Sequence, residues 1–192
     1  MAAAPNPIAS PRYLSSTEQA IHLFTDLQHS VDAHHQLMQA VEHKNLKGIR
    51  AHLDQAGTLD KAGWSALGLA TKMRYDEGVR ELAPLEKQLH MDVKLKMGSM
   101  TVTRPTALIL AAYYNYQSTI EILLEFESGA TDGEGRVALV HASAMGNLEA
   151  VKLLAPREGD LYADDALKVC CSEAKDSPHK SQIKELLRSY IM

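Results

Sequence analysis

The 192-residue sequence predicts an all-α solenoid of about five stacked helix pairs behind an amino-terminal capping helix. Two observations predict this fold: a short motif recurs at similar spacing, and two helical apolar patterns accompany each clear copy. The motif is Ala-Leu-x-x-Ala or a close variant, and its leucines are Leu37, Leu67, Leu108, Leu139 and Leu167. Their steps of 30, 41, 31 and 28 residues indicate a unit that buries its apolar face only by stacking on its neighbours.

The fourth unit displays the helix pair most clearly. Apolar residues recur every three positions from Leu139 to Met145, which is one face of a helix. Gly146-Asn147 then breaks the helix, because both residues tolerate left-handed turns. A second helix follows, and Pro156 is predicted to end it before the exit Glu158-Gly159-Asp160.

These motifs resemble a known family. The order Asp-x-x-Gly-x-(Thr/Ser/Val)-Ala-Leu-x-x-Ala, followed by Gly-Asn-Leu-Glu-Ala-Val-Lys-Leu-Leu, resembles the ankyrin repeat, in the Ala-Leu variant abundant in some protozoan parasites. The likeness is strongest at 132–159 and weakest in the first and last units. Arg104 stands where the hairpin glycine is expected, and Arg74-Tyr75 replaces the Gly-His-type turn, so irregular loops are predicted at both places.

The resemblance gives a plan for the whole chain. Residues 1–14 are expected to be a flexible extension, because they hold three prolines and few large apolar side chains. Ser15-x-x-Glu18 fits a capping box and opens a predicted capping helix, with a partner-docking or dimerising helix as the alternative. The predicted single domain spans 15–192, with the capping helix at 15–31 and repeats at about 34–59, 60–90, 104–131, 132–159 and 160–190.

The 41-residue step contains an insertion at 87–103. Met91, Val93, Leu95 and Met97 alternate with polar residues, which is the period of a β-strand. A turn at 98–99 would return the chain into a second strand, so we predict an extended hairpin, with a flexible loop as the alternative. Extensions of this kind commonly project on the binding side of a solenoid.

Composition and charge argue against nucleic-acid and membrane partners. The net charge of −4 gives no global attraction to nucleic acid or to anionic membranes. No apolar run approaches the roughly 18 residues of a membrane span, and no signal peptide is evident. A cytoplasmic protein without nucleic-acid or membrane partners is expected. A monomer is favoured, and a homodimer through the capping helix or the insertion is the alternative.

No catalytic, cofactor or metal site is predicted. The sequence holds no phosphate-binding glycine loop and no nucleophile elbow. Cys170 is expected to replace a buried alanine, and His141 to be a structural residue within the core. The carboxylates Glu121, Glu125, Glu127 and Glu149 are interpreted as solvated faces.

The ankyrin resemblance implies a concave binding surface made of hairpin tips and first-helix residues. Trp, Tyr, Arg and Met are residue types suited to such a surface, although Trp64 could instead pack within its hairpin. Carried over by the match of the motif, the predicted partner-binding residues are Lys61, Trp64, Lys72, Met73, Tyr113, Tyr114, Glu134, Arg136, Met145 and Tyr162.

The predicted function is non-catalytic protein–protein binding by an intracellular scaffold or adaptor, with the insertion as a second contact. The alternatives are a regulatory subunit or inhibitor that docks onto an enzyme such as a kinase and, less favoured, a homodimeric structural protein.

Overall fold

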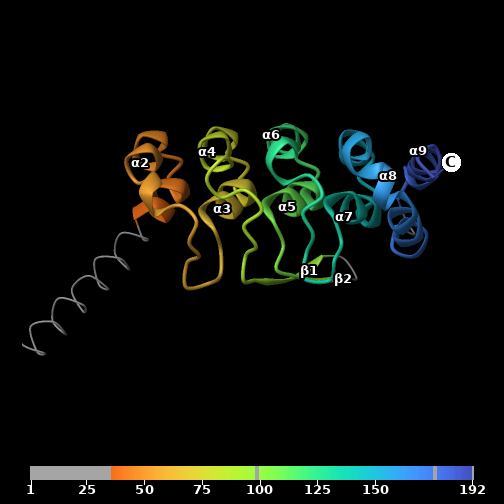
Figure 1. Cartoon of the computed structure of the whole chain (residues 1–192), viewed down its shortest axis with the longest axis horizontal. Coiled ribbons are helices and arrows are strands. Elements are labelled where there is room, and N and C mark those ends of the chain that lie inside the picture. Colours follow the sequence, from red (N-terminus) through yellow and green to blue (C-terminus); the bar gives the residue numbers. More distant parts are fainter. Residues whose placement is uncertain (1–35, 98–99, 175–176, 192) are drawn as a thin grey trace, which may run out of the picture.

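The computed structural model describes residues 36–97, 100–174 and 177–191. Over these ranges the chain forms a single row of helix pairs, with inner helices in one layer, outer helices in a second layer, and hairpin loops projecting beyond the inner layer (Figure 1). The predicted extension at 1–14 and the capping helix at 15–31 lie outside the described residues.

The helices alternate between the two layers. Residues 36–42 are helical and are followed by α2 (Leu46–Ala51) and the short 3-10 helix η1 (Leu53–Gln55). The inner helices of the next three units are α3 (Ala66–Lys72), α5 (Ala107–Tyr114) and α7 (Ala138–Met145). The outer helices are α4 (Asp76–Leu82), α6 (Gln117–Glu127) and the first part of α8 (Leu148–Ser172), and α9 (Lys180–Arg188) ends the row.

The anchor leucines build the shared core. Leu37, Leu67, Leu108 and Leu139 are 0–2% exposed, at the same position in four successive units. The inner helices α3, α5 and α7 pack in series, as do the outer helices α4, α6 and α8, so each unit covers its neighbour. The prediction of stacked helix pairs is confirmed.

In the second, third and fourth units a buried glutamate, in or just after the outer helix, bonds to the inner helix of the same unit. Glu86, Glu127 and Glu158 each follow an anchor leucine by 19 residues, and each side chain accepts a hydrogen bond of 2.7–2.8 Å from the amide of that leucine. The amide belongs to the first turn of the inner helix, where N–H groups have no partner within the helix. The carboxyl group therefore caps the inner helix, and the interpretation of Glu127 as a solvated residue is wrong.

The two arginines expected to distort their loops do not do so. Arg104 has φ 50°, close to the left-handed values of Gly63 and Gly135 at the equivalent hairpin positions. Arg74 has φ 51°, which matches Asn115 in the next unit. The repeat therefore imposes the left-handed conformation on arginine, at a cost of roughly 1–2 kcal/mol per residue, and the prediction of irregular loops is wrong.

The predicted boundary between the fourth and fifth units is also wrong. Pro156 lies inside α8, and the expected exit at 158–160 is helical. Proline removes one helical hydrogen bond, but the neighbouring packing retains the helix. Ala163 stands where the earlier hairpins have Gly63 and Gly135, and alanine favours a helix over a left-handed turn.

The fifth unit consequently has no hairpin. The carboxy-terminal part of α8 replaces its inner helix, and α9 packs on α8 as its outer helix. Leu167, the fifth anchor, is only half-buried, although Cys170 is fully buried as predicted.

The insertion forms the predicted hairpin. Strand β1 (Lys94–Met97) pairs antiparallel with β2 (Met100–Thr103), so that Met97 lies opposite Met100. Upstream of β1, Met91 is fully buried against Gly68 of α3, where a Cβ would clash with the Met91 sulfur. In Figure 1 the hairpin lies below the inner helices, on the side of the other hairpin loops.

Candidate functional site

The face that was predicted to be concave, called the concave face below, is built from hairpin loops and from the last residues of the inner helices. In the second unit Lys72 Nζ lies 4.4 Å from the centroid of the Trp64 ring, so the end of α3 faces the hairpin loop. In the fourth unit Ala144 and Met145, at the end of α7, face Met97 and Met100 of the β-hairpin. Tyr113 and Tyr114 hold the equivalent positions in α5 when the units are aligned on their anchor leucines. They therefore lie on the same side of the solenoid as Lys72 and Met145.

A tyrosine cluster occupies the middle of this face. The Tyr113 and Tyr114 rings meet edge to face with centroids 4.9 Å apart, and Tyr114 stacks on Tyr116 at 5.3 Å. The Arg74 guanidinium lies 5.4 Å from the Tyr116 ring, which connects the second unit to the third. Tyr114 is 39% exposed, and burial together with Tyr113 raises the pKa of its hydroxyl, which stays protonated and able to donate.

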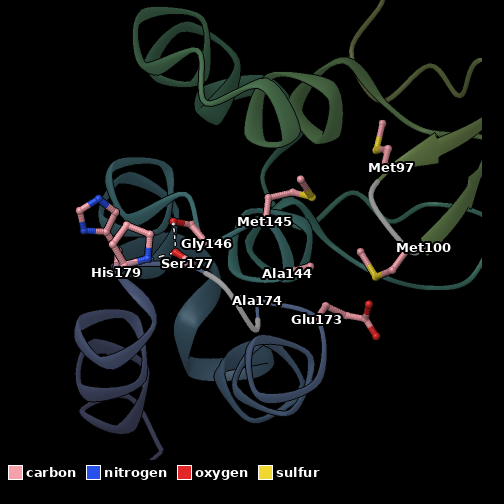
Figure 2. A pocket seen from close by; sticks show the side chains of 10 residues that line it. Met97, Met100, Ala144, Met145, Gly146, Glu173, Ala174, Ser177 and His179 are labelled. Carbon is pink, nitrogen blue, oxygen red and sulfur yellow. Dashed lines mark hydrogen bonds between the residues drawn. The ribbon is translucent and has the colours of Figure 1, made fainter.

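A methionine-lined pocket opens between the β-hairpin and the carboxy-terminal end of the solenoid (Figure 2). Its volume is ≈ 370 Å³. Met97 and Met100 line one side, Met145 lines the opposite side, and the side chains of Glu173 and His179 lie at its rim. Methionine adapts to apolar groups of different shape, so the pocket suits an apolar side chain of a partner.

The fourth hairpin loop is held by a buried polar network. Asp132 Oδ1 accepts hydrogen bonds from the amides of Glu134 and Arg136, and its Oδ2 lies 2.9 Å from Nε2 of the fully buried His141. Burial acts to raise the pKa of Asp132, but hydrogen bonds and charges from His141 and Arg136 outweigh it and lower the pKa to about 2. His141 is therefore structural, as the sequence indicated.

Two predicted partner residues are engaged in this network. Arg136 forms ion pairs with Asp132 at 3.1 Å and with Glu134 at 2.7 Å, and it also donates to the Thr101 carbonyl. Glu134 accepts from the hydroxyl of Thr103 at 2.7 Å. Both side chains fasten the β-hairpin to the fourth unit, so their first role is to position the insertion.

Tyr162 is not at a hairpin tip, because the fifth unit has no hairpin. It was expected at a hairpin tip, but it lies within α8 and is half-buried. Lys61 is exposed at the second hairpin loop, and Met73 is half-buried at the end of α3 next to Lys72. The structure thus gathers Trp64 with Lys72, Tyr113 with Tyr114, and Met145 with the hairpin methionines.

Sequence reasoning missed several residues of this face. Met97 and Met100 were assigned only to a hairpin, and Tyr116 was not singled out. The alternating pattern of the hairpin gave a partial signal for these methionines, because the apolar face of a two-stranded hairpin must pack against another surface. The position of Met97, Met100 and Met145 around one pocket depends on tertiary packing, which no local sequence pattern contains.

Charge is distributed unevenly between the two faces. Exposed cations occur around the hairpins and the ends of the inner helices: Lys61, Lys72, Arg74, Lys94, Lys96 and Arg104. The outer helix α6 carries Glu121 and Glu125 on its exposed side and no basic residue. The concave side is thus locally basic in a chain whose net charge is −4.

Groups with catalytic or ligand chemistry are dispersed. Cys170 is buried and burial raises the pKa of its thiol, whereas Cys171 is exposed. Within the described ranges, no three His, Cys, Asp or Glu side chains are grouped to hold a metal ion. Among the same residues, no helix has the length and apolarity needed to cross a membrane.

Stacked helix pairs with hairpin loops along one face define a repeat solenoid. A family model described as ankyrin repeats in three copies matches residues 86–165. Residues 86–165 of the chain are therefore ankyrin repeats. The second unit, most of which precedes the match, shares this construction, since Glu86 caps α3 as Glu127 caps α5. Proteins of this family are in general protein–protein interaction modules and are typically non-catalytic.

Proposed function

We propose that the protein is a non-catalytic intracellular scaffold or adaptor that binds a protein partner through its concave face. The observation that carries the proposal is the row of aromatic side chains and methionines on that face: Trp64 beneath Lys72, the Tyr113–Tyr114 pair, and the pocket of Met97, Met100 and Met145. Such residues dominate the energetics of many interfaces.

The rigidity of the solenoid supports this function. Tyr113 and Tyr114 end a helix whose preceding six residues are at most 2% exposed, so their backbone is fixed before binding. Asn147 Nδ2 donates to the carbonyls of Ala112 and Tyr113 and fastens this helix end to the next unit. A preorganised surface loses little conformational entropy on binding, which leaves more of the contact energy as affinity.

Affinity capture from native lysate tests the proposal. The variant Trp64→Ala/Tyr113→Ala/Tyr114→Ala is expected to lose the partners of the wild-type chain, because each hot-spot aromatic contributes about 2 kcal/mol or more. A second variant, Lys72→Glu, changes an exposed side chain and is expected to weaken capture while its thermal unfolding stays near the wild-type temperature.

The matched control is Glu121→Ala/Glu125→Ala on the exposed side of α6. It should retain every partner of the wild type. Loss of partners in this control, with unchanged capture by both concave variants, would refute the proposed surface.

A further inference from the structure

We propose that the outer edge of β1 binds an extended segment of a partner protein that alternates acidic and apolar residues and adds to the hairpin as a third strand. The proposal deepens the proposed function and rests on it in one respect, namely that the partner is a protein. Strand addition supplies affinity through backbone hydrogen bonds and specificity through alternate side chains.

The register of the hairpin determines which backbone groups face outward. Met97 lies opposite Met100 and Leu95 opposite Val102, and the amide of Arg104 donates to the carbonyl of Val93 at 3.1 Å. Hydrogen-bonded pairs alternate with non-hydrogen-bonded pairs in an antiparallel ladder. Lys94 and Lys96 therefore belong to the non-hydrogen-bonded pairs, and their amides and carbonyls point away from β2.

The outer edge of β2 already forms hydrogen bonds with the fourth hairpin loop. The carbonyl of Thr103 accepts from the amide of Gly133 at 2.7 Å, and the carbonyl of Thr101 accepts from Arg136 at 2.8 Å. Glu134 receives the amide of Thr103 at 3.2 Å. The fourth hairpin loop thus bonds to the outward carbonyls of Thr101 and Thr103 and to the outward amide of Thr103.

The outer edge of β1 is closed only where the hairpin begins. The amide of Asp92 donates to the carbonyl of Gly63 at 2.9 Å, in the second hairpin loop. Beyond that point, in the part of the chain that the structure describes, the outward amides and carbonyls of Lys94 and Lys96 have no hydrogen-bond partner. This edge therefore offers two donors and two acceptors in strand geometry.

The side chains along the edge specify the chemistry of the added strand. Lys94 and Lys96 are exposed on one face of the hairpin, whereas Leu95 is half-buried on the other. Between Lys87 and Arg104 the chain carries four Lys or Arg residues and a single carboxylate, Asp92. Directly opposite side chains interact across a strand pair. Carboxylates would lie beside the two lysines, and an apolar side chain would lie beside Leu95.

A second copy of the chain fits this edge poorly. Antiparallel pairing of two β1 edges would place Lys94 and Lys96 against the same cations of the copy, and like charges directly opposite are destabilising. Lysine on an edge strand is a known protection against self-pairing. The same lysines attract an acidic strand, so the edge excludes copies of itself and admits a partner of opposite charge.

The free edge adjoins the proposed concave surface. The Asp92–Gly63 hydrogen bond holds the start of β1 against the hairpin loop that also carries Lys61 and Trp64. At its other end β1 finishes at Met97, which lines the methionine pocket of Figure 2. A strand along this edge would thus run between the second hairpin loop, which carries Trp64, and the methionine pocket.

Titration of the full chain with a synthetic peptide of alternating Glu and Val tests the inference by calorimetry and amide NMR. The comparison peptide has the same composition with its Glu and Val residues in two blocks. We expect the alternating peptide to bind at least tenfold more tightly, with the largest amide shifts at Lys94 and Lys96. Raising the salt concentration should weaken binding, because the lysines are exposed.

Two variants separate backbone pairing from charge. Lys96→Pro removes an outward amide and spares the β1–β2 ladder, as proline is tolerated at such edge positions, and Lys94→Gln/Lys96→Gln removes the charges. Each is expected to weaken binding about tenfold, the size of one lost charge-assisted or backbone hydrogen bond. Lys152→Gln/Lys168→Gln, on α8, is the matched control and should bind as the wild type does.

Equal binding of both peptides, or wild-type affinity in Lys96→Pro, would overturn strand addition. A wild-type dimer in light scattering that Lys96→Pro dissociates would also overturn it, because the edge would then hold a second copy. If the peptide fails to bind while the Trp64, Tyr113 and Tyr114 substitutions still abolish capture, the inference fails and the proposed function stands. If the peptide binds but the Trp64, Tyr113 and Tyr114 substitutions leave capture unchanged, the inference stands and the proposed concave surface fails.

Discussion

Replacing Leu108 with alanine is expected to lower the free energy of unfolding by about 2–5 kcal/mol, the range for large-to-small changes in packed cores. Leu108 is 1% exposed and lies in the central unit, where α5 packs against both α3 and α7. A cavity at this position weakens two interfaces between units, and a solenoid depends on those interfaces for its stability. Urea unfolding followed by far-ultraviolet circular dichroism measures the effect.

The matched control is Leu167→Ala, at the same position of the motif in the fifth unit. Leu167 is half-buried because α8 replaces the hairpin and inner helix of that unit. Its loss should cost clearly less, roughly 1 kcal/mol for half of a leucine side chain. Equal effects of the two substitutions would contradict the distinct construction of the fifth unit.

Replacing Glu127 with glutamine is expected to remove a marked pH dependence of stability. Burial raises the pKa of Glu127 to about 7 from the usual 4.5, against the hydrogen bond from the Leu108 amide. Its Oε1 has no hydrogen-bond partner within the described residues, whereas the Oε1 atoms of Glu86 and Glu158 accept from the amides of Gly57 and Gly129. The missing hydrogen bond explains why the pKa is raised more at Glu127 than at Glu86 or Glu158.

The sign of the effect follows from the raised pKa. The folded state binds the proton more tightly than the unfolded chain, so the contribution to stability is complete below pH 4.5 and is lost as the pH rises through 7. Its size is about 3 kcal/mol, at 1.36 kcal/mol per pKa unit. Urea midpoints between pH 4.5 and 8 should therefore fall more steeply for the wild type than for Glu127→Gln.

Glu121→Gln provides the control, because Glu121 is exposed on the same helix. Its pH profile should follow that of the wild type. Parallel profiles for the wild type and Glu127→Gln would contradict the assignment of Glu127 as a buried carboxyl group that takes up a proton on folding.

Periodicity in the sequence predicts most of this fold because the stacking residues repeat. The leucines at 37, 67, 108 and 139, the strand alternation of 91–97 and the buried Cys170 all follow from local patterns. The fifth unit escaped prediction because Pro156 is a strong local signal for a helix end. Continuous packing of α8 against α7 and α9 outweighs that signal, and the missing hairpin glycine at Ala163 removes the alternative.

The proposed binding face is predicted less completely than the fold. Alignment of the units on their anchor leucines predicted that Lys72, Tyr113, Tyr114 and Met145 share one side of the solenoid, since equivalent positions of a repeat share an orientation. Register alone gives no information about which of these side chains have partners within the chain. Arg136 and Glu134 hold the β-hairpin in place, a contact over more than 30 residues that only the folded chain reveals.

The central claim is that partners bind the concave face, and site-specific photo-crosslinking in cell lysate tests it most directly. A photoreactive phenylalanine analogue at Tyr114, which is exposed at the end of α5, should form adducts with a partner protein. The same analogue at Glu121, exposed on α6, should form none. Adducts at Glu121 and none at Tyr114 would contradict the claim.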